Sequence, residues 1–187
     1  MPRICVALVV VALMSVGTVA TSIAVAKTAA APCQDANLLP TATNMAAINA
    51  VTLCLVDRIR AAHHLPMLRA NRELQTVAIT QAVEMVSQDF FSHDSPSGQT
   101  PAARVASTRY PVHARSLSTA QNIGWGTGAY ATPAHMVAAW MASPPHRQII
   151  LTGEYRDAGV GVAVPVPSVV GHGEPGATYA IEFGARH

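Results

Sequence analysis

Charged residues are scarce in this chain. Only 12% of its 187 residues are charged, and 12 basic residues against 10 acidic ones leave a net charge of +2. No run of basic residues occurs, and binding to nucleic acid needs clustered cations, so a nucleic acid is not an expected partner. Lysine is almost absent, because Lys27 is the only one. The body of the chain therefore has no lysine for Schiff-base chemistry.

Half of the residues are hydrophobic, which is enough for the core of one domain of this length. The first 26 residues have the pattern of a secretory signal peptide. Arg3 provides the positive start, residues 4–14 form an apolar stretch, and Ala-Val-Ala precedes Lys27. The alternative is an uncleaved anchor. Contact with a membrane is expected only through such an anchor. Cleavage predicts a secreted protein, either extracellular or held in the cell envelope.

Cysteine is also rare. Removal of the leader takes Cys5 with it and leaves Cys33 and Cys54. Two cysteines in an exported chain predict one disulfide, which would connect the N-terminal arm (residues 27–43) to the first helix. The alternative is a free, buried Cys54 and a loose Cys33.

Helical patterns come before strand patterns along the chain. Apolar spacing predicts a helix from Asn44 to about Ala62, and a second one capped by Asn71 that ends near Phe90. A short helix is expected around residues 102–107, mostly loop over 108–131, and a helix that begins at Thr132-Pro133 and stops at "SPPH". "AGVGVAVPV" and "ATYAIEFGA" alternate like two strands. This order predicts an α+β sandwich, with helices first and a C-terminal β-hairpin.

Two of the eight histidines stand apart. His93 in "FFSHDSP" and His146 in "ASPPHRQ" each follow a predicted helix end, so they could meet in a cleft and bind a metal; the alternative is hydrogen bonding within their own loops. A Ser92-His93-Asp94 triad is not expected, because adjacent side chains in a turn point in different directions. The remaining histidines are predicted to be solvated or to lie at a helix end, and the two tryptophans are predicted to lie in the core.

Several segments together resemble the CAP superfamily, which comprises the cysteine-rich secretory, antigen 5 and pathogenesis-related class 1 proteins. The resemblance runs from about Leu53 to the C-terminus (a domain over residues 44–187) and is greatest to the bacterial branch. It implies a three-layer α-β-α sandwich. The segments that carry it are "LVDRIRAAHHLPMLRANRELQTVA", "FFSH", "AQNIGWG", "WMASPPHRQIIL" and "YRDAGVGV".

The resemblance also implies a cleft with histidines and acids that holds a divalent metal in some members. His93 matches the first histidine, His146 the histidine of the bacterial branch, and Gln121 the position where the family usually has glutamate. Gln121 cannot carry charge or act as a general base. The predicted site therefore has two nitrogen ligands and no anion, unless Asp94 or Glu154 supplies one.

The resulting expectation is a secreted, non-catalytic binding module. The candidate cofactor is a weakly bound divalent metal such as zinc, held at His93 and His146. The family implies a lipid, a cell-wall component or a protein as the partner. The alternative is a metal-dependent hydrolase or protease that uses the same two histidines. A structural module of the cell wall is a third possibility.

Overall fold

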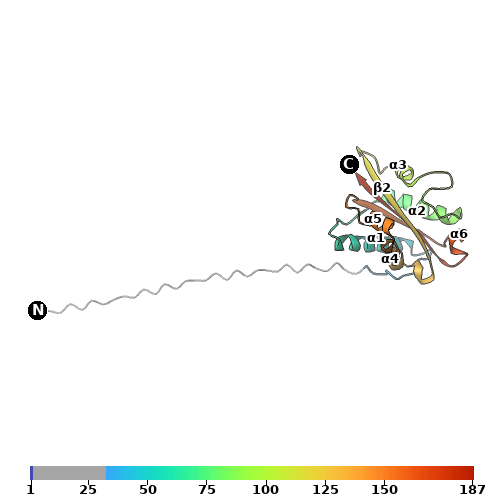
Figure 1. Ribbon diagram of the computed structural model, residues 1–187, viewed down its shortest axis with the longest axis horizontal. Helices are drawn as coiled ribbons and strands as arrows, with labels where there is room; N and C mark the ends of the chain where they lie inside the picture. Colours follow the sequence, from blue (N-terminus) through green and yellow to red (C-terminus); the bar gives the residue numbers. More distant parts are fainter. Residues whose placement is uncertain (2–32) are drawn as a thin grey trace. The chain divides into compact units, whose positions relative to one another are not determined.

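The computed structural model describes residues 33–187, together with Met1 (Figure 1). The predicted leader and residues 27–32 of the arm lie outside the described residues, Met1 apart. Within 33–187, no helix has both the length and the apolar character that a membrane crossing requires. The elements in chain order are α1 (Met45–Ala62), β1 (Arg69–Ala70), α2 (Arg72–Ser87), α3 (Pro101–Ala106), β2 (Leu117–Thr127), η1 (Gly128–Ala131), α4 (Pro133–Ala142), α5 (Pro144–Ile150), β3 (Asp157–Ala163), α6 (Ser168–Gly171) and β4 (Gly176–Arg186).

The helices begin where local signals predict them. The Asn71 side chain accepts hydrogen bonds from the backbone N–H groups of Glu73 and Leu74, which fixes the start of α2. Thr132 caps α4 in the same way, through the N–H of His135. α4 ends at Ala142, directly before "SPPH", as predicted. A further helix follows at once, because Pro144 and Pro145 occupy the first turn of α5, where a missing N–H costs nothing.

The prediction of mostly loop over residues 108–131 is wrong, because the 11-residue strand β2 occupies 117–127. The polar residues and glycines of β2 hide the alternation of apolar and polar side chains that is typical of a strand. The strand with which it pairs, β4, lies far along the chain. The described sheet has the order β1-β3-β4-β2, so β2 is an edge strand. β2 runs antiparallel to β4, with Gln121 opposite Glu182. β3 and β4 form the predicted C-terminal hairpin.

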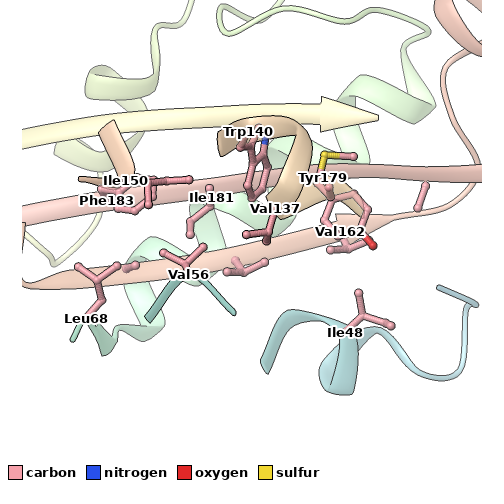
Figure 2. Packing of buried hydrophobic residues seen from close by; sticks show 14 of the residues in the cluster. Ile48, Val56, Leu68, Val137, Trp140, Ile150, Val162, Tyr179, Ile181 and Phe183 are labelled. Carbon is pink, nitrogen blue, oxygen red and sulfur yellow. The ribbon is translucent and has the colours of Figure 1, made fainter. Parts of the chain in front are cut away.

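Helices cover both faces of the sheet, which confirms the three-layer α-β-α sandwich. The larger core lies between the sheet and helices α1 and α4, where Trp140 packs with Val137, Tyr179 and Ile181 (Figure 2). On the opposite face, α2 packs its Ala78 and Met85 against Ile123 and Ala180. Successive β4 residues point to opposite faces, so Ala180 and Glu182 share the α2 face.

α2 lies directly on β3, and two glycines allow this. A Cβ atom on Gly159 would lie 2.0 Å from the backbone nitrogen of Gln75, and one on Gly161 would lie 2.2 Å from the carbonyl carbon of Ala78. No larger residue fits without displacing the helix. The height of α2 above the sheet is therefore set by these two positions.

The predicted disulfide is present, because Cys33 and Cys54 are bonded. Cys54 lies within α1, so the bridge ties the arm to that helix. The arm also contacts α4, because the Ala36 carbonyl accepts a hydrogen bond from the Ala134 N–H over 2.9 Å. The segment that precedes α1 is thus fixed to two helices of the same layer.

Candidate functional site

His93 lies in the loop between α2 and α3, and two buried side chains hold the backbone of that loop. Gln81 of α2 donates from Nε2 to the Ser92 carbonyl over 2.7 Å. Arg104 of α3 donates from Nη2 to the His93 carbonyl over 2.6 Å. Both residues are almost inaccessible to solvent, whereas the His93 imidazole is exposed. The loop is thus fixed from inside, and the imidazole faces outward.

A continuous hydrogen-bonded chain runs from this imidazole into the interior. Gln121 Oε1 lies 2.7 Å from His93 Nδ1. The other atom of the same amide, Nε2, donates to Glu182 Oε1 over 2.5 Å. Gln121 and Glu182 occupy opposite register positions on β2 and β4, so the sheet itself aligns them.

Glu182 is one of two buried acids among the described residues, and it has no solvent-accessible surface. Burial raises its pKa to about 7, while the hydrogen bond from Gln121 and the charge of Arg104 act in the opposite direction. Its second oxygen, Oε2, has no hydrogen-bond partner among the described residues. An acid that is costly to bury and only half satisfied is the kind of group that marks a functional site.

His146 lies in the first turns of α5, on the opposite face of the sheet from α2. Its Nδ1 is 2.7 Å from the hydroxyl of Ser143. Its backbone carbonyl accepts from Asn122 Nδ2 over 3.1 Å, so Asn122 joins β2 to α5 and does not bond its own loop. Burial and the nearby His93 lower the pKa of His146, which favours the neutral imidazole.

A cleft of about 450 Å³ lies between these two walls, over the free edge of β2. Its apolar lining includes Trp125, which is 39% exposed; the prediction that Trp125 belongs to the core is therefore wrong. Trp140 is buried as predicted, and its indole N–H donates to the Ile123 carbonyl over 2.9 Å. The residues that line the cleft are Phe91, Ser92, His93, Ile123, Gly124, Trp125, Met136, Ala139, Trp140, Ser143 and His146.

The structure therefore brings together the three residues expected to form a cleft: His93 and His146 line it, and Gln121 contacts His93 from behind. Neither acid considered as a substitute for a family glutamate fills that role. Asp94 is exposed, and only its backbone N–H is hydrogen-bonded, to the Ser92 hydroxyl. The Glu154 carboxylate accepts from Ser118 and contacts His187 on another part of the surface. An acid that the sequence did not predict, Glu182, lies behind Gln121 and does not line the cleft.

The two histidines predict a bound metal, which would need further ligands from the side chains around them. Within residues 33–187, no group of three or more His, Cys, Asp or Glu side chains is placed to hold an ion. The carboxylate of Glu182 is separated from the cleft by the Gln121 amide. The residues do not fit a zinc site, which takes three or four protein ligands. A weak site of two imidazoles stays a prediction.

Comparisons with known proteins agree with this fold. The family model described as "CAP: Cysteine-rich secretory protein family" matches residues 53–165, more than half of the chain. The chain belongs to this family. No curated protein matches the sequence significantly.

Solved bacterial structures resemble this CAP domain. An extracellular SCP-domain protein of Bacillus anthracis is 25% identical with a TM-score of 0.59, covering 77% of this chain and 43% of that one. An outer surface protein of Borrelia burgdorferi is 18% identical with a TM-score of 0.58, covering 74% and 92%. A cysteine-rich secretory protein of Staphylococcus aureus is 17% identical with a TM-score of 0.55, covering 76% and 40%. The CAP domain thus spans less than half of the Bacillus and Staphylococcus chains.

Proposed function

We propose that this CAP domain is a secreted, non-catalytic binding module whose cleft holds a small amphiphilic molecule, with a lipid or a lipid-bearing wall component as the ligand class. The observation that carries this proposal is the composition of the cleft. Its walls are mainly aromatic and aliphatic, and its few polar groups gather around His93 and His146. A ligand pocket of this kind holds an apolar body and orients it by few polar contacts.

Secretion is supported by two observations. The chain contains a disulfide, and such bridges persist in oxidising compartments. Two of the structural relatives are described as extracellular and outer-surface proteins. The intact mass of protein collected outside the cytoplasm tests this proposal: we expect a chain that begins near Lys27 and contains no free thiol.

A hydrolase is the competing function, and one contact favours it. The Ser143 hydroxyl and His146 Nδ1 are 2.7 Å apart, as in a nucleophile and its base. However, Pro144 and Pro145 follow Ser143, and neither has a backbone N–H that could stabilise an oxyanion. Binding is therefore the better supported function. Ester hydrolysis that disappears in His146→Ala would contradict it.

The binding proposal is tested by titrating the protein with 1-octanol and following tryptophan fluorescence. Trp125→Ala removes an exposed wall of the cleft and leaves Trp140 as the reporter, so we expect binding to weaken about tenfold, as for loss of a large apolar contact. Met67→Ala is the matched control, because Met67 is 65% exposed and lies outside the cleft. No saturable binding by the unmodified protein, or equal loss in both variants, would contradict the proposal.

A further inference from the structure

The chain of Glu182, Gln121 and His93 determines where the proton on the His93 ring lies. When ionised, as it is above its pKa of about 7, the Glu182 carboxylate can only accept hydrogen bonds, so the Gln121 amide turns its Nε2 toward it. The amide oxygen then faces His93 Nδ1, and a carbonyl oxygen also can only accept. Nδ1 must therefore carry the hydrogen. In the neutral ring, the other nitrogen, Nε2, is left as an acceptor.

We propose that Glu182 is a positioning residue which, through Gln121, makes His93 present an acceptor nitrogen to the cleft, so that the ligand's polar end is a hydrogen-bond donor such as a hydroxyl. The ligand part of this inference rests on the proposed function. The side chains that line the cleft indicate that the polar end of the ligand is a donor and not an anion. None of the described residues around the cleft is arginine or lysine, so no permanent cation is there to hold an anionic group.

Arg104, which contacts the loop that carries His93, is a permanent cation held away from the cleft. Arg104 uses Nη2 on the His93 carbonyl and Nη1 on the Gln99 carbonyl, both on the inner side of the loop. His146 favours its neutral form, as described above. A carboxylate ligand would thus face the acceptor nitrogen of His93 with no permanent cation in the lining to hold it, whereas an alcohol can donate a hydrogen bond to His93 Nε2.

The ring nitrogens can be measured directly by ¹⁵N NMR at pH 8, independently of any ligand. In the unmodified protein we expect His93 to be protonated at Nδ1. Glu182→Gln keeps the side-chain volume but removes the carboxylate that orients the amide, so we expect a mixture of both tautomers. Glu84→Gln is the matched control, because Glu84 lies on α2 near Arg104 without contacting Gln121. Protonation of His93 at Nε2 in the unmodified protein would overturn the inference.

The donor requirement is tested with two matched probes, 1-octanol and methyl octyl ether. Only the alcohol can donate a hydrogen bond, and the ether is the less polar of the two molecules. We expect the alcohol to bind about tenfold more tightly, the effect of one hydrogen bond, and the preference to shrink in Glu182→Gln. Ether that binds as tightly as alcohol would overturn the donor requirement. Binding of neither probe, with His93 protonated at Nδ1, would contradict the proposed function but support the role of Glu182.

Discussion

Gln121 and Glu182 face each other across β2 and β4, with 2.5 Å between the amide nitrogen and the carboxylate oxygen. This contact explains why glutamine occupies the position where a glutamate was expected. Two carboxylates at this separation cannot both be ionised. The acid of this site lies one strand further into the sheet, and position 121 must donate to it.

The first prediction follows for Gln121→Glu. At pH 8 the substitution places a second carboxylate beside Glu182, inside the protein, where neither carboxylate can donate a hydrogen bond to the other. We expect the free energy of unfolding to fall by about 3 kcal/mol, as when a buried polar pair is broken. Urea denaturation measures it.

The double variant Gln121→Glu/Glu182→Gln is the control for that result. It restores one amide opposite one carboxylate, with the charge now next to His93. Because the two residues are in contact, their effects should not add, and most of the lost stability should return. A double variant no more stable than Gln121→Glu alone would show that the contact is not what limits this position.

The second prediction concerns pH. The pKa of Glu182 is about 7 in the folded protein, against an ordinary value of 4.5. The unfolded chain therefore releases this proton first. Glu182 contributes stability below about pH 4.5, and this contribution is lost as the pH rises through about 7. From the size of the shift, the loss is about 3 kcal/mol.

Glu182→Gln does not titrate and should not show that loss. Relative to the unmodified protein, its free energy of unfolding should increase by about 3 kcal/mol between pH 4.5 and pH 8. Denaturation of both proteins across this range is the measurement. A difference that stays constant with pH would mean that the carboxyl of Glu182 ionises as readily in the folded chain as in the unfolded one.

The third prediction separates the two tryptophans. Trp140→Phe leaves the Ile123 carbonyl without its donor and opens space in the core, so we expect a loss of about 2 kcal/mol in the free energy of unfolding. Trp125→Phe should change it by less than about 0.5 kcal/mol, because Trp125 is partly exposed. Similar losses in both variants would indicate that Trp125 supports the fold.

The fourth prediction concerns the bridge between Cys33 and Cys54, which are 21 residues apart. Closing a loop of this length restricts the unfolded chain, and replacing both cysteines by serine should lower the free energy of unfolding by about 3 kcal/mol. Thermal denaturation with and without reductant provides the comparison. If reductant destabilises the serine variant as much as the unmodified protein, the effect does not come from this bridge.

Local signals in the sequence were sufficient for most of the helices. Asn71 and Thr132-Pro133 mark helix starts within a few residues, and the alternation in residues 158–166 and 177–185 marks the hairpin. The sequence did not reveal β2, because its pairing partner β4 lies about 60 residues further along the chain. The glycines and polar residues of β2 are also typical of loops. Pairing between distant segments leaves no local trace.

The site was predicted only in part, again because contacts between distant segments leave no local pattern in the sequence. The family resemblance pointed to His93, Gln121 and His146, and these residues are close together. Glu182 was missed because nothing near it in the chain relates it to Gln121; only the sheet register does. One signal was available. Glu182 is a lone acid within the apolar run "ATYAIEFGA", where a charged residue has no structural purpose of its own.

The two glycines beneath α2 bear on the cleft, although neither touches it. His93 follows α2 and is held from Gln81 on that helix, whereas His146 belongs to the layer on the other face of the sheet. The separation of the two imidazoles therefore depends on how high α2 lies above the sheet. A single methyl group at Gly161, placed against the backbone of Ala78, would raise one wall relative to the other. The width of the cleft thus depends in part on the absence of a side chain on β3, a strand that does not line the cleft.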